Sequence, residues 1–376
     1  MRPARLVGAT FLLSMVTLTG GCDPAPVAPM VRADWVELPD GPLSPRRAAV
    51  AAWVGDAFVV VGGWSDAACP PDAECVLDES AARFDGAAFD PATSTWRIIV
   101  PVPEHVAAGA PTAVLGDTLY VAPPPPGGDA SAQSLLAYDA SADTWSSVPA
   151  PANQPAQLVA AGEVLVALAG TDEHGPATDV VYSPASGEWM PLPDDPLGPS
   201  FDRSAVWTGD GLLLAATDLV PSPNSERPAL VRLAVNDAKD GSWSEPLETE
   251  VLAGPAAVVA GRVVFPVLGS MDGGEVGNWG RSYPLGGILD LGTMEWSELP
   301  EAADRGGPAP LPPVVVAGRV VVGHGLLDPV TGEWQRLPAM PDEAVERAVA
   351  ASEEMLVVWG GATTTAPTDV GYLLRP

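Results

Sequence analysis

Basic residues, histidines, cysteines and long apolar runs are all scarce in this sequence. Lysine and arginine together number 18 against 48 acidic residues, so the formal net charge is −30 over 376 residues. A chain this acidic lacks the basic surface that nucleic-acid binding requires, and it is poorly suited to docking on anionic lipid headgroups. We attribute the acidity to solubility, because a large net charge keeps a protein dispersed.

Only three histidines occur, His105, His174 and His324, and they lack the paired spacing of a metal site. Acidic residues also gather in several loop-like segments, such as residues 65–82, where their carboxylates could bind calcium. No spacing among them matches a defined calcium-binding loop. We therefore predict neither a metal site nor a cofactor.

One apolar run, from Leu6 to about Leu18, stands near the N-terminus. It is shorter than the ~20 residues that a membrane-spanning helix needs, and Arg2 and Arg5 precede it. A short basic region followed by an apolar run of this length is typical of a secretory signal peptide. We therefore assign residues 1–21 to a signal peptide and expect the protein to be exported.

The apolar run ends in the sequence LTGGC (18–22), which resembles a bacterial lipobox. In that motif the cysteine becomes the new N-terminus and carries lipid, so the resemblance implies lipidation of Cys22. Thr19 departs from the motif, in which leucine is commonest, and the alternative is an ordinary signal peptide with a stray cysteine. Residues 22–34, rich in Pro and Ala, are then a stiff tether that holds the protein at a membrane of the bacterial cell envelope.

The other two cysteines, Cys69 and Cys75, lie six positions apart in the segment CPPDAEC. In an exported chain such a pair predicts a disulfide that pins one loop. A metal site is the alternative, although no histidine or further cysteine lies nearby in the sequence.

Internal repeats determine the predicted fold. Short runs rich in Val, Leu and Ile are bounded by Gly, Pro and Asp, which is a strand signature. Six segments combine an apolar residue, a turn and a Trp: FDPATSTW (89–96), YDASADTW (138–145), YSPASGEW (182–189), VNDAKDGSW (235–243), LDLGTMEW (289–296) and LDPVTGEW (327–334). Seven apolar strands alternate with these segments, and two of them end in a Gly-Gly pair, at 62–63 and 360–361.

Each unit therefore consists of strand, tight turn, strand, loop, strand, turn and Trp strand, which is a four-stranded antiparallel blade. The Gly-Gly pair and the Tyr/Phe-Asp-Pro-x-Thr-x-x-Trp hairpin resemble the kelch repeat, over nearly all of residues 35–376. The resemblance implies an all-β, seven-bladed kelch-type β-propeller, like the central domain of galactose oxidase, and says nothing of the ligand. Six blades are the alternative, because the sixth unit is short.

Seven second strands are present, but only six of them have a Trp strand downstream. The last unit ends in VGYLLRP without one, whereas WVELP (35–39) stands alone at the other end of the chain. We expect this N-terminal strand to complete the last blade and close the ring, which removes exposed sheet edges. The recurring Trp is expected to pack between blades, because a ligand site rarely needs sevenfold repetition.

The order of strands in a blade indicates where binding residues should lie, because alternate connections fall on opposite faces of the ring. In an antiparallel blade the 2–3 loops share one face with the links between blades, and these loops vary, so we expect them to carry binding. Three arginines, Arg47, Arg203 and Arg347, stand where a linker enters the innermost strand, and together they could clamp a carboxylate or phosphate. The alternative is that each pairs with a nearby acid, such as Asp202 or Glu346.

No catalytic constellation is evident in the sequence. We therefore predict a non-enzymatic, exported and lipid-anchored binding scaffold that presents its variable 2–3 loops to a protein or a glycan. The alternative is a carbohydrate-active enzyme, sialidase- or epimerase-like, that uses an arginine-lined channel mouth.

Overall fold

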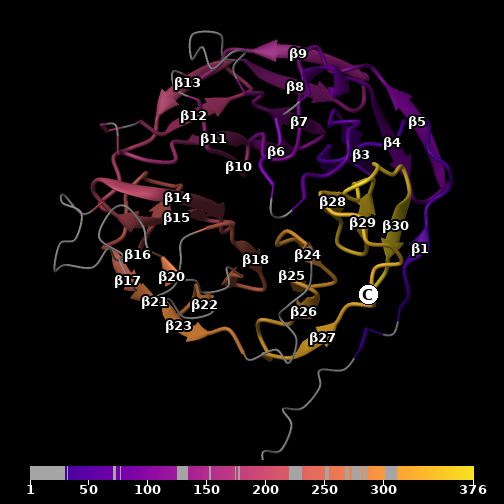
Figure 1. The fold of residues 1–376 in the computed structure, drawn as a ribbon. Helices are drawn as coiled ribbons and strands as arrows, with labels where there is room; N and C mark the ends of the chain where they lie inside the picture. The colour runs from indigo at the N-terminus through magenta and orange to yellow at the C-terminus, as the bar shows by residue number, and fades with distance from the viewer. Residues whose placement is uncertain are drawn as a thin grey trace, which may run out of the picture.

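The repeated units form seven four-stranded antiparallel sheets, arranged as the blades of a ring (Figure 1). The computed structural model of the protein describes residues 30–31, 33–70, 73–76, 78–124, 134–151, 154–173, 175–176, 178–219, 231–249, 254–266, 271–272, 281–282, 286–300 and 311–376. The predicted signal peptide, Cys22 and most of the predicted tether lie outside the described residues. The seven-bladed all-β fold is confirmed, and the six-bladed alternative is wrong.

The strands of each blade run outwards from the ring axis in chain order, except that β1 is the outermost strand of blade 7. Blades 1 to 3 contain β2 (Val50–Val54), β3 (Ala57–Val61), β4 (Gly86–Asp90) and β5 (Thr95–Ile99); β6 (Thr112–Leu115), β7 (Thr118–Val121), β8 (Leu135–Asp139) and β9 (Thr144–Val148); and β10 (Gln157–Ala161), β11 (Val164–Leu168), β12 (Val180–Ser183) and β13 (Glu188–Pro191). Blades 4 and 5 contain β14 (Ser200–Trp207), β15 (Gly211–Asp218), β16 (Val231–Asp237) and β17 (Leu247–Thr249); and β18 (Ala257–Val259), β19 (Arg262–Phe265), β22 (Gly287–Asp290) and β23 (Glu295–Glu298). Blades 6 and 7 contain β24 (Val315–Val316), β25 (Arg319–Val322), β26 (Gly325–Leu327) and β27 (Trp334–Arg336); and β28 (Ala348–Ala351), β29 (Leu356–Trp359), β30 (Gly371–Leu374) and β1 (Val36–Glu37).

Two small elements stand outside the blades. Strands β20 (Met271–Asp272) and β21 (Arg281–Ser282) form a separate two-stranded ladder, and a 3-10 turn, η1 (Glu79–Ala81), lies in the long loop of blade 1. Within the described ranges no helix is long and apolar enough to cross a membrane.

The N-terminal strand closes the ring, as predicted. Strand β1 lies antiparallel to β30, with Val36 opposite Leu373, so the first and last strands of the propeller belong to one sheet. The packed body begins slightly before β1, because Val31 is buried against blade 6 and its N–H donates to the carbonyl of Arg336 at 2.9 Å. Part of the segment predicted to be a tether therefore packs on the propeller.

The core lies between the blades. Along β3, Val59 packs towards Leu136 of blade 2, whereas Phe58 packs towards Trp359 of blade 7. All four side chains are at most 1 % exposed. Because both faces of a middle strand are covered by neighbouring blades, these strands appear in the sequence as continuous apolar runs without alternation.

The recurring tryptophan fastens six of the seven blades to the preceding blade. In six blades the indole Nε1 donates to the carbonyl four positions after the preceding blade's tryptophan, at 2.7–3.0 Å: Trp35 to Pro338, Trp96 to Pro39, Trp145 to Val100, Trp189 to Pro149, Trp243 to Pro193 and Trp334 to Pro300. Trp296 of blade 5 breaks the pattern, because its Nε1 is buried without a hydrogen-bond partner. The equivalent acceptor is Leu247, which instead lies in β17 opposite Leu233. The recurring tryptophans are thus structural.

The 3–4 turns also repeat one arrangement. In blade 1, Asp90 Oδ1 accepts hydrogen bonds from the N–H groups of Ala92 and Thr93 at 2.8 and 3.3 Å. The same pattern recurs at Asp139, Asp290 and Asp328. The bonds from the Thr93 hydroxyl and the Ala92 amide hold the pKa of Asp90 below its ordinary value. An Asp at the start of the turn therefore caps main-chain donors that the hairpin leaves unpaired.

Candidate functional site: the loop face of the ring

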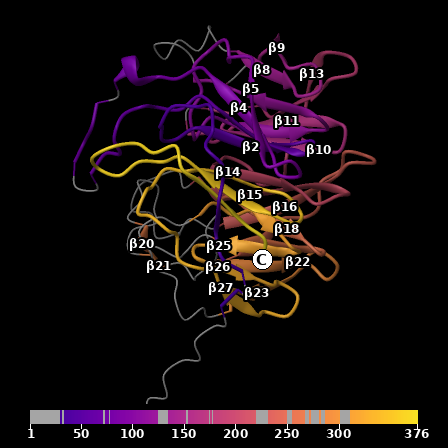
Figure 2. The same ribbon diagram turned by 90° about the vertical axis from the view of Figure 1, so that its right-hand side faces the viewer.

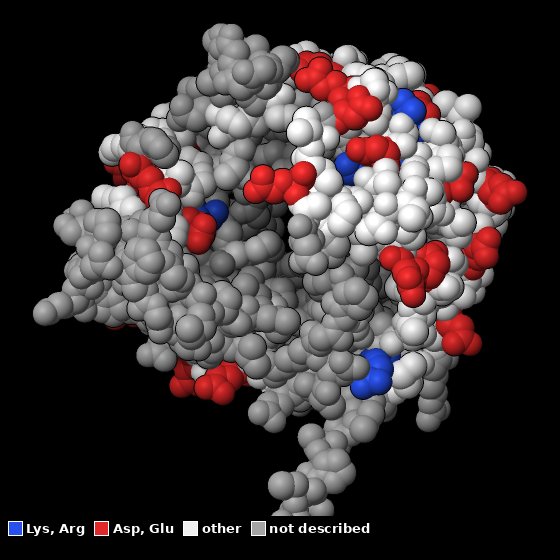
Figure 3. Space-filling model, in the orientation of Figure 1, with Lys and Arg blue, Asp and Glu red and all other residues white. Residues whose placement is uncertain are grey.

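The two faces of the ring differ in regularity. We call the face with the 1–2 and 3–4 turns the turn face, and the face with the 2–3 loops and inter-blade linkers the loop face. In Figure 2 the loop face lies on the left, with β20 and β21. The 2–3 loops range from two residues, 323–324, in blade 6 to residues 62–85 in blade 1. The space-filling view shows several acidic groups and few basic ones on the described surface of this face (Figure 3).

The longest described loop, in blade 1, is closed by the predicted disulfide. Cys69 and Cys75 are bonded, with an S–S distance of 2.16 Å. Next to the bridge, the N–H of Ala68 donates to the carbonyl of Thr363 in blade 7 at 2.9 Å. The loop therefore spans the junction between blades 1 and 7, and within it Val76 is 95 % exposed.

A pair of glycines lets the same loop approach blade 2. Gly62 and Gly63 have positive φ angles of 73° and 88°, which favour glycine. The N–H of Gly63 donates to the carbonyl of Val106, in the linker into blade 2, at 2.8 Å. A Cβ on Gly62 would lie 2.1 Å from that carbonyl oxygen. The Gly-Gly pair thus brings the residue that follows, Trp64, against the linker.

Trp64 lies in an aromatic cluster, which we define as Trp64, Phe84 and His105. The ring centroids of Trp64 and His105 are 4.3 Å apart, and those of Phe84 and His105 are 5.8 Å apart. The Nε2 atom of His105 lies 3.1 Å from the carbonyl of Gly63, which fixes the imidazole. Phe84 is 43 % exposed, and the other two rings are partly exposed. Sequence reasoning missed this cluster, although Trp64 is one of the tryptophans outside the recurring position.

Arg47 is held between blades 1 and 7. Its Nε donates to Asp66 at 2.8 Å and its Nη1 to Glu346 at 2.6 Å. Burial alone would lower the pKa of Arg47, but the hydrogen bonds to Asp66 and Glu346 outweigh this effect and leave the pKa raised. The structure thus holds Arg47 between a carboxylate of blade 1 and a carboxylate that precedes the inner strand of blade 7.

Arg203 belongs to a separate set of contacts between blades 3 and 4. Its Nη2 donates to Asp179 at 2.7 Å and to Asp195 at 2.9 Å, and its Nη1 donates to the hydroxyl of Ser200 at 2.8 Å. The Arg203 side chain is 4 % exposed. A buried guanidinium of this kind needs carboxylate partners to offset the loss of hydration.

Arg347 is paired within blade 7. It forms an ion pair with Asp342, donates to the carbonyl of Gly360 at 2.9 Å, and lies 5.6 Å from the ring centroid of Tyr372. Burial lowers the pKa of Arg347 despite Asp342. Burial, together with a hydrogen bond to Asp342, raises the pKa of Tyr372 to about 12.

The three arginines do not occupy equivalent places. A non-glycine residue with φ of 49–54° marks the start of the inner strand in three blades: Ala48, Asp202 and Glu346. Arg203 and Arg347 follow this residue, whereas Arg47 precedes it and pairs across the sheet with Trp64. The sequence alignment that grouped them was therefore two residues out of register for Arg47. Whether they bind a ligand stays a prediction.

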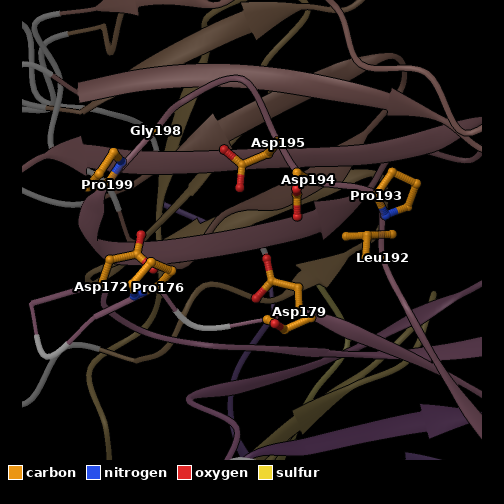
Figure 4. A pocket seen from close by; sticks show the side chains of 10 residues that line it. Asp172, Pro176, Asp179, Leu192, Pro193, Asp194, Asp195, Gly198 and Pro199 are labelled. Atoms are coloured by element: carbon orange, nitrogen blue, oxygen red, sulfur yellow. The ribbon is translucent and has the colours of Figure 1, made fainter.

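An acidic cleft of about 220 Å³ lies on the loop face between blades 3 and 4. Its aspartates are Asp172, Asp179, Asp194 and Asp195, and Figure 4 shows the last three around one opening. Arg203 compensates Asp179 and Asp195, whereas Asp194 is exposed. Burial raises the pKa of Asp179 even with Arg203 beside it. The remaining negative charge favours cationic over anionic groups in this cleft.

The remaining histidines are placed as follows. His324 lies in the two-residue loop of blade 6, and its Nε2 is buried without a hydrogen-bond partner. His174 lies outside the described residues. Over the described ranges, no three side chains of His, Cys, Asp or Glu are grouped as metal ligands would be.

Comparison with known proteins bears on the fold. No family model matches the chain. Kelch-like protein 35 of Mus musculus is 28 % identical over 159 residues, which are 41 % of this chain and 24 % of that protein, so the chain spans about a quarter of the length of this curated relative. The solved structure of YjhT covers 89 % of this chain and 95 % of its own, with a TM-score of 0.47 and 12 % identity. The chain is thus a seven-bladed β-propeller with four-stranded blades, and part of its sequence is similar to a kelch-like protein.

Proposed function

We propose that this protein is an exported, lipid-anchored binding scaffold that presents its loop face to a protein or a glycan. The observation that carries the proposal is the contrast between the two faces. In four blades the 3–4 turn repeats one hydrogen-bond pattern, whereas the 2–3 loops differ from blade to blade. On a rigid scaffold, binding residues are usually found in the segments that vary.

The arginine contacts support a scaffold more than a catalyst. Arg47, Arg203 and Arg347 each donate to at least one carboxylate, so a substrate anion would have to displace a partner that is already in place. No described contact favours the sialidase- or epimerase-like alternative, which stays a prediction.

The lipid anchor is proposed from the sequence around Cys22. The packed body begins by Val31, so a chain lipidated at Cys22 would hold the propeller close to the membrane. Cys22→Ser should move the protein from the membrane fraction to the soluble fraction, since the acidic propeller has little attraction for anionic lipid. A Cys22→Ser protein that still sediments with membranes would rule out the anchor.

Photo-crosslinking tests the loop face directly, because exposed valines stand on both faces. Val76→p-benzoylphenylalanine places the probe on the disulfide loop, and Val330→p-benzoylphenylalanine places it on a 3–4 turn, where the native side chains are 95 % and 57 % exposed. In source cells we expect a discrete adduct from position 76 and none from position 330. Adducts of equal yield from both, or from position 330 alone, would contradict the proposal.

A further inference from the structure

We propose that the aromatic cluster of Trp64, Phe84 and His105 is a stacking platform for an uncharged sugar ring of a glycan. This inference rests on the proposed function, since it names the ligand class for one part of the loop face. It concerns a site that no repeat position predicts, and it is argued from ring geometry, exposure and neighbouring charge.

His105 packs on both other rings, and all three rings are at least partly exposed. His105 lies between the other two, with interplanar angles of 58° to Trp64 and 72° to Phe84. Centroid distances of 4.3 and 5.8 Å leave no slot in which a flat aromatic ligand or a quaternary ammonium group could be enclosed. A ligand must therefore lie across the cluster from the solvent side.

The cluster is built into blade 1 and is absent from its nearest structural counterpart. Trp64 pairs with Arg47 and Ala82, and in blade 7 the same bridge positions are held by Ala362, with Val345 and Pro367 as its partners. Both blades keep the Gly-Gly pair, yet Ala362 is fully buried, whereas Trp64 is partly exposed. An aromatic ring at this position therefore adds nothing that the repeat itself requires.

Two carboxylates are sequence neighbours of the ring residues, and each is oriented by a hydrogen bond. Asp66 lies two residues from Trp64, its side chain is 29 % exposed, and it is oriented by Arg47. Glu104 precedes His105 and accepts a hydrogen bond from the Ser134 hydroxyl at 2.8 Å. A pyranose has one apolar face of C–H groups, which packs on an aromatic ring, and hydroxyls at its rim, which donate to oriented carboxylates.

Charge decides between neutral and acidic sugars. Asp66 and Glu104 lie within two residues of Trp64 and His105 in the chain, and the chain as a whole carries a formal charge of −30. A sialic or uronic acid would meet repulsion from these groups and from the field of the whole protein. An uncharged hexose or N-acetylhexosamine would not.

The test is binding of the purified propeller to an array of neutral and uronic-acid-containing oligosaccharides, followed by titration calorimetry with the best neutral binder. We expect neutral glycans to bind, and Trp64→Leu or Phe84→Ala to weaken binding at least fivefold. Trp64→Phe, which keeps a ring, should retain more affinity than Trp64→Leu. The matched control is Ile98→Ala, which removes an equally apolar, 67 % exposed side chain from the outer strand of the same blade and should leave the affinity unchanged.

The outcomes separate this inference from the proposed function. Failure of the folded protein to bind any neutral glycan, or equal affinity in Trp64→Leu and the wild type, would overturn the platform. If adducts to a protein still form from position 76, the loop-face scaffold stands without it. If neither glycans nor adducts are found, both proposals fail.

Discussion

The turn face and the loop face of the ring are built from different kinds of contact. On the turn face, Asp90 and its counterparts in other blades cap main-chain donors in the same way. On the loop face, the disulfide, the aromatic cluster and the acidic cleft each belong to one blade or one pair of blades. A contact that recurs in many blades reports how the ring is held together, so we look for function among the contacts that occur once.

The largest expected effect comes from the strand that closes the ring. Deleting residues 35–39 removes β1 and the Trp35 bond to Pro338, and it leaves β30 as an exposed edge. The loss of the tryptophan alone is worth ~3–5 kcal/mol. Urea unfolding should show a large fall in stability, with deletion of residues 24–29 as the control. Similar midpoints for the two deletions would contradict ring closure by β1.

Arg203 is the loop-face residue whose loss should destabilise the fold most. Arg203→Met leaves Asp179 buried and without its guanidinium, which should cost ~3–5 kcal/mol at pH 7. The pKa of Asp179 is already raised by burial, so this carboxyl favours the folded state most in its protonated form. The destabilisation caused by Arg203→Met is therefore present at neutral pH, and it shrinks as the pH falls through the raised pKa of Asp179.

The pH dependence can be checked with a second variant. Arg203→Met combined with Asp179→Asn should recover part of the stability and flatten the pH profile between neutral and acidic conditions. If Arg203→Met is as stable as the wild type at pH 7, the fold does not depend on the ion pairs of Arg203. A role of Arg203 in ligand binding then becomes the better interpretation.

The tryptophan bonds give a smaller, paired prediction. Trp189→Phe removes a bond to Pro149 and should cost ~1–2 kcal/mol, including the loss of ring volume. Trp296→Phe removes a buried donor that has no partner, so it should cost about 1 kcal/mol less. Thermal unfolding of the two variants side by side is the measurement. Equal losses would mean that the missing bond in blade 5 has no energetic consequence.

The smallest effect is expected on the turn face. Asp90→Ala should lower stability slightly at pH 7, because one of several equivalent turns loses its cap. The pKa of Asp90 is depressed in the folded state, so its contribution is present above the ordinary aspartate pKa and is lost as the pH falls through the depressed value. Wild type and Asp90→Ala should therefore converge in acid, as monitored by circular dichroism.

Much of the fold was predictable because the repeat is local. Each hairpin carries its Asp and Trp within a few residues, and the lone WVELP strand could be assigned to the last blade by counting. The disulfide was also predictable, because its two cysteines lie only six positions apart in the sequence. Contacts between linkers and loops were not, since the approach of His105 to Trp64 depends on the packing of blade 2 against the Gly-Gly pair.

The arginines show how a small change in register misleads a sequence comparison. A residue with positive φ begins the inner strand in all three blades, but Arg47 lies before this residue, whereas Arg203 and Arg347 lie after it. The acidic cleft could not be predicted from the sequence, because two separate segments form it. Asp172 and Asp179 come from a 2–3 loop of blade 3, whereas Asp194 and Asp195 come from the linker that follows that blade.

The most direct test of the central claim is an exchange of loops between two blades. Residues 65–81 of blade 1 connect the bridge partners Trp64 and Ala82, and residues 363–366 of blade 7 connect the equivalent partners Ala362 and Pro367. Replacing the first segment by the second leaves every repeated contact in place. The exchange removes the disulfide and the Asp66 partner of Arg47, so we predict a folded protein with a moderately lower unfolding midpoint. We also predict that it loses the source-cell proteins that the immobilised wild type retains, whereas glycan binding through Trp64, Phe84 and His105 should persist. An exchanged protein that is folded and still retains the same proteins would contradict the account.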